Sequence, residues 1–441
     1  MAVDLLMNHP AHTSKTNFSQ PVGSPLAERA LALVFDIPER SVIASPFQQP
    51  DMVRNSAALL SLDSSVASTR ALAHAGFRYI RPFVVLPSIT EPRWLLPENN
   101  SRQAVRGLEL YTPFSIRTRV LKALGTGMAA AGFPGHSRSR VIVASREFLP
   151  IENVVRGLTQ ETRPGFAISI GTPITCQKLT VQAMSPAGDI LAYIKIPLGP
   201  EAESRIQAEA TILKKLSAFP QMRSRIPRLL SASDLGAGKF FVQTCLPGSP
   251  GPTLLTDLHD EFLRDLHSCG CLEWPGEAVV AETSAVWKRL AKGIHSSWRN
   301  LSREAFGLAA RELAGKRLTC APMHGDFTPW NSRAYSGQLF CFDWESANWQ
   351  APIHWDRFHF LAQTHSLTNK GAGPESLPET RDGARGSFIL YLLYSAAQLA
   401  AENSPPATLE YREQLLRRQL SGEMAGAPSQ ISKVVANASQ L

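Results

Sequence analysis

The sequence predicts an α+β protein in which a strand-rich part precedes a mainly helical part. Residues 166–196 hold three short apolar runs, and the turn Pro186-Ala187-Gly188-Asp189 separates the last two as in a hairpin. Beyond residue 254 the longer apolar segments have helical periodicity. Strands and helices that are segregated along a chain are typical of α+β folds.

The length of the chain predicts more than one domain. A single ordinary core does not need 441 residues, and 44% hydrophobic and 19% charged residues are globular values. We predict a flexible arm at 1–26, an extension of unknown role at 27–150, a strand-rich lobe at 151–247, a helical lobe at 248–420 and a tail at 421–441.

The extension at 27–150 has the mixed helix and strand signals of an α/β segment. The expected helices are 51–62, which begins at an Asp cap, and 116–131, and the expected strands are 79–86, 93–96 and 140–144, with 29–37 either a strand or a short helix. No catalytic constellation occurs in this segment. It is either an independent domain or an extension packed on the next lobe, and the sequence leaves both open.

A cluster of positive charge lies within the extension. Residues 101–146 hold eight bases and one acid, in a chain of net charge +8. Such an excess can attract phosphates, nucleic acid or anionic surfaces. A solvated face, or Arg side chains paired with acids elsewhere, is the favoured explanation. No Arg/aromatic motif for nucleic acid is present, so no nucleic-acid partner is expected.

Lys195 is the first residue that suggests chemistry. It stands among apolar residues on the strand predicted at 190–196, and a buried Lys is costly unless it is paired. The next predicted helix, 201–217, places Glu209 among apolar neighbours fourteen residues later. Glu203 is the rival partner. Kinases pair a strand Lys with a helix Glu in this way to contact phosphates.

The remaining elements connect this region to the helical lobe. Two strands are expected at 226–230 and 239–244 around a Gly-rich turn at 234–238, whose spacing is not that of a Walker loop. Helices are expected at 254–267, 284–314, 388–401 and 410–420, with a loop at 370–384. His259 and His267 are interpreted as structural residues and not as metal ligands.

The stretch Met323-His324-Gly325-Asp326-Phe327-Thr328-Pro329-Trp330-Asn331 carries the strongest functional signal. A Ser336-Gly337 turn and an apolar run follow, and they lead to Asp343 at a strand end. Phosphoryl transfer needs a carboxylate to take the proton of the acceptor hydroxyl and hard oxygen ligands for Mg²⁺. Asp326 suits the first role, and Asn331 and Asp343 suit the second.

These residues resemble the aminoglycoside phosphotransferase and choline kinase family, whose pattern His-Gly-Asp-x-x-x-x-Asn followed by Asp-Trp-Glu is complete here at 324–331 and 343–345. The resemblance implies a bilobal protein-kinase-like fold that binds ATP between a β-rich N-lobe and a mainly helical C-lobe. It implies that Asp326 is the catalytic base and that His324 orients the loop. It also implies that Asn331 and Asp343 hold Mg²⁺.

The same resemblance assigns nucleotide contacts in the N-lobe. Lys195, paired with Glu209, orients the phosphates, and Gly171 lies in the turn that covers them. This turn has a single Gly before Pro173, so its glycine-rich signal is weak, and the proline removes a backbone donor. Gln243 begins the hinge between the lobes, where backbone groups hold the adenine. Asp356, at a helix start after Asp343, resembles the residue that supports the catalytic loop.

The resulting hypothesis is an ATP-dependent kinase for a hydroxyl group of a small molecule. Sugars, amino sugars, amino alcohols and aminoglycoside-like acceptors all remain open, as do ATP versus GTP and the oligomeric state. Trp344, Glu345, Trp349 and Trp355 lie near the acceptor side in sequence, although Trp residues are as often core. Two alternatives are a nucleotide-binding pseudokinase or scaffold, and a partner- or polyanion-binding module at 27–150.

The six cysteines and the absence of long apolar segments predict a cytoplasmic protein. Cys245 and Cys341 stand in apolar strand-like contexts, and Cys269-Gly270-Cys271 is too short for a zinc site. No run of 18 apolar residues predicts a membrane span, and Met1 to Gln20 lacks the apolar core of a secretory signal.

Overall fold

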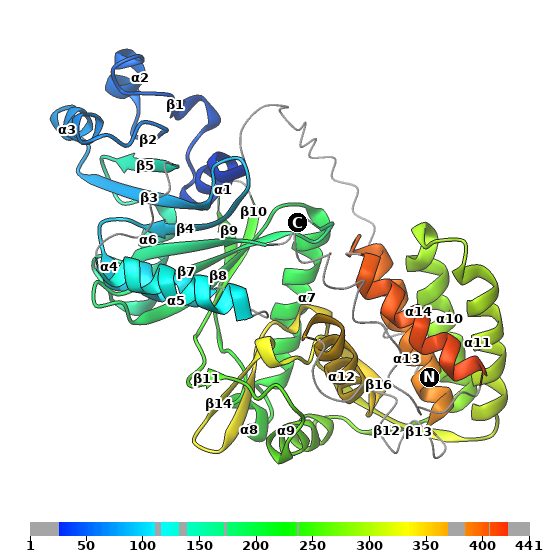
Figure 1. Ribbon diagram of the computed structural model, residues 1–441. Coiled ribbons are helices and arrows are strands. Elements are labelled where there is room, and N and C mark those ends of the chain that lie inside the picture. Colours follow the sequence, from blue (N-terminus) through cyan, green and yellow to red (C-terminus); the bar gives the residue numbers. More distant parts are fainter. Residues whose placement is uncertain are drawn as a thin grey trace.

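The computed structural model describes residues 26–110, 116–131, 139–171, 174–235, 238–368, 384–404 and 406–421, and a sheet of ten strands dominates these ranges (Figure 1). In order across the sheet, the strands are β1 (Val42–Ile43), β2 (Ala58–Ser61), β5 (Arg140–Ser145), β3 (Tyr79–Pro87), β4 (Pro92–Pro97), β6 (Gly165–Ile170), β7 (Lys178–Met184), β8 (Ile190–Pro197), β10 (Gly238–Gln243) and β9 (Leu229–Leu235). Only β1 and β2, of the neighbouring pairs described, run parallel.

The extension and the strand-rich lobe share this sheet. Strand β4 of the extension pairs with β6 of the lobe through Trp94↔Ser169 and Leu95↔Ile168. A hydrophobic core also continues across the junction, because Leu95 and Phe166 belong to the same buried cluster. The extension is therefore packed edge to edge on the lobe, while the division near residue 150 stays a prediction.

Helices cover both faces of the extension's sheet. They are α1 (Leu26–Phe35), α2 (Pro50–Asn55), α3 (Val66–His74), α4 (Ser101–Gly107), α5 (Ile116–Ala130) and α6 (Pro150–Thr159), with short 3₁₀ turns η1 (Glu39–Ser41) and η2 (Leu108–Leu110). Neighbouring residues of a strand point to opposite faces. Accordingly, Leu95 packs in the core that includes α1 and α6, and Leu96 packs in the core that includes α4 and α5.

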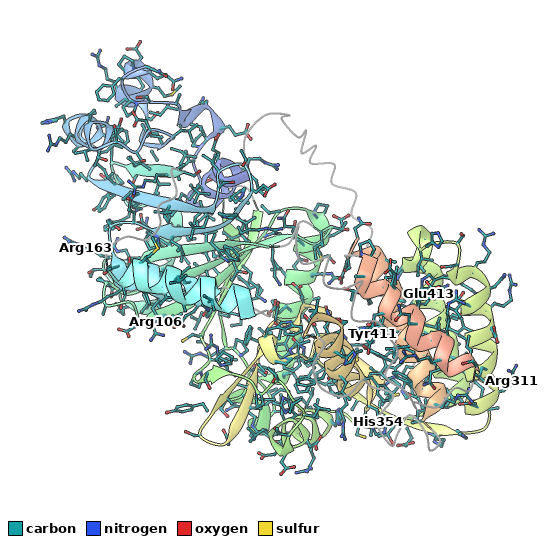
Figure 2. The ribbon with its side chains drawn as sticks, in the orientation of Figure 1. Arg106, Arg163, Arg311, His354, Tyr411 and Glu413 are labelled. Carbon is teal, nitrogen blue, oxygen red and sulfur yellow. The ribbon has the colours of Figure 1, made fainter. Side chains whose placement is uncertain are left out.

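Several bases of the 101–146 cluster make internal contacts. Arg146 donates to the carbonyls of Ala75 at 2.7 Å and Ser56 at 3.1 Å. Arg140 pairs with Glu98 at 3.1 Å, and Arg106, which Figure 2 labels beside α5, pairs with Glu109 at 2.5 Å. These contacts agree with the explanation in which the bases of this cluster are paired within the protein. Arg138 lies outside the described residues.

Helices α7 (Pro200–Leu216) and α8 (Pro220–Arg223) lie within the strand-rich lobe. The described residues after 248 are mainly helical, as predicted, and their helices are α9 (Asp257–His267), α10 (Gly276–Leu290), η3 (Ala291–Gly293), α11 (Trp298–Leu313), α12 (Trp355–Thr368), α13 (Arg385–Ala401) and α14 (Pro406–Ser421). One small sheet contains β11 (Ser249–Pro250), β14 (Ser332–Tyr335) and β15 (Gln338–Cys341), and another contains β12 (Leu272–Pro275), β13 (Arg317–Met323) and β16 (Asn348–Pro352).

The α+β class is thus confirmed, with a β-rich part and a helical part in the predicted order. Figure 1 shows α10, α11, α13 and α14 gathered at one end of the molecule, away from the large sheet. Their apolar faces form a second core around Phe358, Phe388 and Leu392. No helix in the described ranges is both long enough and apolar enough to cross a membrane.

Some predicted boundaries are wrong. The helix expected at 51–62 ends at Asn55, and Ala58–Ser61 is the buried strand β2, because a short apolar run suits a strand as well as a helix. The helix expected at 254–267 begins at Asp257 and leaves Leu254 exposed. The segment 284–314 is two helices separated by η3.

Two further differences concern strands and chain ends. The strands expected at 226–230 and 239–244 are β9 and β10, and β9 begins at Leu229 and runs on to Leu235, the second residue of the expected turn. The predicted arm at 1–26, tail at 421–441 and loop at 370–384 lie almost entirely outside the described residues.

A buried ion pair joins β3 to α6 inside the extension. Arg81 donates to both carboxylate oxygens of Glu152, at 2.7 and 2.6 Å, and Leu149 N–H donates to Glu152 Oε2 at 2.8 Å. Removing one partner leaves a buried charge without compensation. We expect Glu152→Ala to lower the free energy of unfolding by about 3 kcal/mol, measured by urea denaturation. The exposed Glu147→Ala is the control, and an equally small effect of both variants would contradict this account.

Candidate active site

A buried carboxylate holds the backbone of the loop that follows β13. Asp356, buried at the start of α12, accepts the backbone N–H groups of His324 at 2.8 Å and Gly325 at 3.0 Å. Two charge-assisted hydrogen bonds from one side chain fix the chain direction at the point where the strand ends. The loop-supporting position of Asp356 proposed from the sequence is thus seen in the geometry.

Gly325 is required at its position for two reasons. Its φ is +84°, which L side chains rarely adopt, and a Cβ would lie 2.0 Å from the carbonyl oxygen of Ser346. We expect Gly325→Ala to displace the loop and to lower the free energy of unfolding by more than about 1 kcal/mol. Thermal denaturation checks this. Gly337→Ala is the control, because Gly337 also has positive φ but has open space around it, so only the backbone term should appear.

His324 is a buried positioning residue. Its Nδ1 accepts the Asp326 N–H at 3.3 Å, and its Nε2 lies 3.0 Å from the Phe342 carbonyl oxygen, to which it donates. These partners select the neutral tautomer with the proton on Nε2. Burial lowers the pKa of His324, in agreement with the neutral form. The imidazole therefore ties the loop to the segment that leads to Asp343.

The carboxylate of Asp326 lies between an amide and an imidazole. Asn331 Nδ2 donates to Asp326 Oδ2 at 2.7 Å and to its carbonyl oxygen at 3.0 Å. His359 Nε2, on α12, lies 3.0 Å from Asp326 Oδ1. Burial acts to raise the pKa of Asp326, but the hydrogen bond and charge of His359 outweigh it and hold the pKa below its usual value. An ionised carboxylate is thereby available to accept a proton.

The hairpin β14–β15 delivers Asp343. Ser336 and Gly337 both have positive φ, as expected for the tight turn predicted at this pair. Two residues beyond β15, Asp343 takes a left-handed conformation with φ 68° and caps the 3₁₀ turn η5 (Trp344–Ser346). The bend turns the Asp343 side chain back toward the N-lobe lysines.

The lysine–glutamate pair predicted from the sequence is formed. Lys195 Nζ on β8 lies 2.6 Å from each carboxylate oxygen of Glu209 on α7 and 2.6 Å from Asp343 Oδ1. Glu209 is fully buried, and it also accepts the N–H of Trp344 at 3.3 Å. Burial raises the pKa of Glu209, and Lys195 opposes that shift. Glu203, the rival partner, accepts a hydrogen bond from Gln207 on the same helix.

Lys178, which the sequence reasoning left out, and Glu345, which it placed near the acceptor side, complete this cluster. Lys178 Nζ, at the start of β7, lies 2.7 Å from Asp343 Oδ1 and also pairs with Glu345. Although burial acts to lower the pKa of Lys178, the carboxylates of Asp343 and Glu345 raise it well above its usual value. Burial likewise acts to raise the pKa of Asp343, but the two lysines hold it far below its usual value. Lys178 and Asp343 are therefore both charged.

The cluster has the donor set of a hard divalent cation. One carboxylate oxygen from each of Glu209, Asp343 and Glu345 lies within 4.8 Å of the others. Oxygen ligands of this kind suit Mg²⁺. Asn331 commits its amide nitrogen to Asp326, which leaves its carbonyl oxygen as a ligand atom. The residues present therefore fit a magnesium ion.

Comparison with known proteins decides the family resemblance. Residues 191–356 match the phosphotransferase enzyme family. The matched segment begins in β8, ends at Asp356 and includes Lys195, Glu209 and the loop from His324 to Asn331. The resemblance inferred from that loop is therefore confirmed for this part of the chain. No curated protein in the comparison matches the chain.

Solved structures of phosphotransferases are among those that match this chain. The GDP complex of aminoglycoside 2'-phosphotransferase-IIIa is 12% identical, with 61% of this chain and 97% of that chain covered at a TM-score of 0.41. Choline kinase LicA from Streptococcus pneumoniae is 14% identical, with 62% of this chain and 99% of that chain covered at a TM-score of 0.42. A mutant of aminoglycoside phosphotransferase APH(4)-Ia with ADP and hygromycin B is 9% identical, with 63% of this chain and 99% of that chain covered at a TM-score of 0.43.

Gly171 and Gln243, the other predicted nucleotide contacts of this phosphotransferase-like site, lie on the large sheet. Gly171 directly follows β6, its N–H donates to Lys178 O at 3.1 Å, and a Cβ there would lie 2.9 Å from the same oxygen. Gln243 is buried at the end of β10, opposite Tyr193 on β8, and its Oε1 has no hydrogen-bond partner among the described residues. The structure places neither in contact with Asp326.

The tryptophans that follow the loop from His324 to Asn331 have different surroundings. Trp344 is buried and donates to the Cys341 carbonyl at 3.1 Å. Lys215 lies 3.3 Å above the ring of Trp349. Trp355 is almost fully buried, and its indole N–H donates to Ser387 at 3.2 Å. Trp344 is therefore a core residue, and Trp355 lines a pocket.

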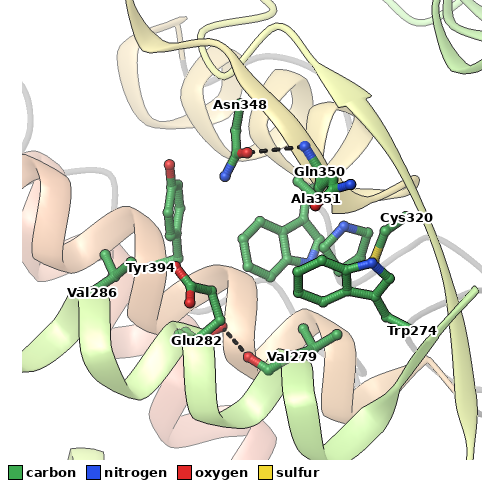
Figure 3. Close-up of a pocket in the computed structure, with 12 residues that line it drawn as sticks. Trp274, Val279, Glu282, Val286, Cys320, Asn348, Gln350, Ala351 and Tyr394 are labelled. Carbon is green, nitrogen blue, oxygen red and sulfur yellow. Dashed lines mark hydrogen bonds between the residues drawn. The ribbon is translucent and has the colours of Figure 1, made fainter. Parts of the chain in front are cut away.

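That pocket lies between α10, β16 and α13 (Figure 3). Figure 3 shows Glu282 and Tyr394 approaching it from the two helices, with Asn348 on the strand side and Trp274 across from them. Asn348 Oδ1 accepts the N–H of Gln350 at 3.0 Å. Asn348 also pairs in β16 with Met323, the residue before His324. The pocket residue Asn348 is therefore paired with the residue that directly precedes the loop beginning at His324.

Proposed function

We propose that this protein is an ATP-dependent phosphotransferase that moves the γ-phosphate of ATP to a hydroxyl of a small molecule. The observation that carries the proposal is the convergence of three separate chain segments. Lys195 and Glu209 from the N-lobe meet Asp343, and the loop that holds Asp326 is hydrogen-bonded to the same stretch through His324 and Phe342. The family match over residues 191–356 supports it.

Asp326 is the general base of the proposed reaction. The acceptor hydroxyl gives its proton to an Asp326 oxygen as its own oxygen forms a bond to the γ-phosphorus. The bond from that phosphorus to the oxygen bridging the β-phosphate breaks, and ADP leaves with the electron pair. Asn331 holds one oxygen of Asp326 and His359 the other, so the carboxylate is fixed before substrate arrives.

The charged cluster would hold the nucleotide. Lys195, fixed by Glu209, presents its ammonium group to the phosphates. Asp343, the carbonyl oxygen of Asn331 and Glu345 are the residues that would hold Mg²⁺, which supplies neutralisation of phosphate charge when bound. Gly171 and Gln243 remain proposed contacts at the phosphate-covering turn and at the hinge.

The acceptor would be a sugar, an amino sugar, an amino alcohol or an aminoglycoside-like compound. The pocket of Figure 3 holds side chains of suitable chemistry, which are indole and phenol rings, the carboxylate of Glu282 and amides, but its volume of about 30 Å³ has room for one water molecule and not for such an acceptor. Aromatic faces together with acids suit cationic and sugar ligands. Strand β16, which lines this pocket, follows Asp343 in the chain directly after the turn η5.

The test is Mg²⁺-dependent consumption of ATP across a panel of such acceptors, with GTP run in parallel. Wild-type protein is compared with Asp326→Ala and with Asp51→Ala, which removes an exposed carboxylate on α2. We expect acceptor-dependent turnover in wild type and in Asp51→Ala, and its loss in Asp326→Ala. Equal turnover in all three proteins would contradict the assignment of Asp326.

A nucleotide-binding protein without turnover is the second candidate. The specific observation in its favour is that two lysines already occupy Asp343 Oδ1. A metal that binds Asp343 has to compete with both of them. Binding of ATP without consumption in the presence of any acceptor of the panel would favour this candidate.

A further inference from the structure

Lys178 lies on the same face of the sheet as Lys195. Strands β7 and β8 are antiparallel, with Thr180 opposite Lys195 and Lys178 opposite Pro197. Residues directly opposite each other, and residues two apart on one strand, share a face. The two lysines are therefore diagonal neighbours on the face toward Asp343, although Lys178 belongs to a strand outside the segment that matches the phosphotransferase family.

Both ammonium groups contact the same carboxylate oxygen. Asp343 Oδ1 lies 2.7 Å from Lys178 Nζ and 2.6 Å from Lys195 Nζ, and Glu345 adds a second carboxylate to Lys178. The five side chains of the cluster, which include Glu209, hold three negative and two positive charges. A cation that enters among the carboxylates has to displace an ammonium group from them.

Lys178 is the more easily displaced of the two lysines. Lys195 is held by both oxygens of Glu209, and its side chain is only 5% exposed. Lys178 has no contact with Glu209 among the hydrogen bonds of the described residues, and its side chain is 14% exposed. Its partners are Asp343 and Glu345, which are the groups that a metal ion would take.

The segment before Lys178 is hydrogen-bonded to the C-terminal lobe. Thr175 N–H donates to the Glu402 carbonyl at 3.3 Å, and Thr175 Oγ1 donates to the Ala401 carbonyl at 3.1 Å, both at the end of α13. Gly171, at the other end of this turn, is hydrogen-bonded to Lys178 itself. Lys178 thus enters the cluster from the turn predicted to cover the phosphates.

We propose that Lys178 is a second phosphate-binding cation of the nucleotide site, and that it occupies the metal-binding carboxylates when the site is empty. In a complex with a magnesium nucleotide, Asp343 and Glu345 would hold the ion, and the Lys178 ammonium would contact the phosphates. This inference rests on the proposed phosphotransferase function. It assigns to Lys178 a specific role in nucleotide affinity, and it explains why Asp343 holds two lysines.

The proposal predicts opposite changes in two affinities for Lys178→Met. ATP affinity in Mg²⁺, measured by calorimetric titration, should fall about tenfold, the scale of one hydrogen bond to a charged group. Mn²⁺ affinity without nucleotide, measured by the electron paramagnetic resonance signal of free Mn²⁺, should rise severalfold because the competing ammonium is gone. Lys178→Arg should keep ATP affinity within about threefold of wild type, since it retains the charge.

Controls separate this role from a structural one. Lys214→Met removes an exposed lysine of α7 and should leave both affinities unchanged. Lys178→Gln combined with Glu345→Gln keeps the net charge of the cluster, and it serves if Lys178→Met does not fold; its ATP affinity should also fall about tenfold. Unchanged ATP affinity, or a parallel loss of ATP and Mn²⁺ affinity, would overturn the proposal. Absence of ATP binding by the wild type would overturn the proposed function itself.

Discussion

Asp326→Asn is expected to lower turnover by about 10²–10⁴-fold while leaving the affinity for ATP within about threefold of wild type. The asparagine has the same shape and can still accept the hydrogen bond that Asn331 donates at 2.7 Å. It cannot accept a proton from the acceptor hydroxyl. The effect should therefore appear in the rate of transfer and not in nucleotide binding.

Single-turnover kinetics with saturating nucleotide measure this effect directly. Asp51→Asn, an exposed substitution on α2, controls for the loss of a carboxylate in general. A rate for Asp326→Asn within tenfold of wild type would show that another group takes the proton. His359 would then be the first residue to test, since its Nε2 lies 3.0 Å from Asp326 Oδ1.

Lys195→Met is expected to affect stability and activity together. Glu209 is fully buried and would lose the ammonium that contacts both of its oxygens at 2.6 Å. Breaking a buried pair in this way typically costs about 3–5 kcal/mol of unfolding free energy. Loss of the phosphate-orienting charge should also lower turnover by about 10²–10³-fold, on the scale of losing one preorganised donor.

A second substitution separates the two effects. Lys195→Met combined with Glu209→Gln removes both charges and keeps an acceptor for the Trp344 N–H. We expect this double variant to recover most of the unfolding free energy in urea denaturation while its turnover stays low. Recovery of turnover together with stability would contradict a direct role of Lys195 at the phosphates.

Local patterns were sufficient to predict the central loop and the hairpin after it. Ser336-Gly337 has the residue types that a tight turn requires, and both residues have positive φ. Lys195 and Glu209 were recognisable because each is a charge in an apolar segment, and a buried charge needs a partner. The α+β class followed from the order of strand and helix signals along the chain.

The remaining features depend on contacts between distant segments. In the sequence, Lys178 resembles an exposed lysine at the start of a strand. Its partner Asp343 is 165 positions away, so local patterns do not reveal the pair. His359 meets Asp326 only because α12 packs beneath the loop. The edge pairing of β4 with β6 involves two residue pairs, too few to leave a pattern in the sequence.

Short apolar runs account for the wrong boundaries. The segment Ala58–Ser61 is nearly all buried, so it lacks the alternation that would distinguish a strand from a helix. The break at Ala291–Gly293 also interrupts a periodic apolar pattern that otherwise suits one long helix. Packing against the neighbouring elements decided these cases, and not local propensity.

The measurement that tests the central claim most directly is a calorimetric titration of the wild-type protein with ATP, with and without Mg²⁺. The account predicts saturable binding at one site that weakens at least tenfold when Mg²⁺ is removed, because without the ion the carboxylates of Asp343 and Glu345 repel the phosphates and stay paired with the lysines. Absence of binding, or binding of equal strength without Mg²⁺, would contradict the assignment of the cluster around Lys195 and Asp343 as the nucleotide site.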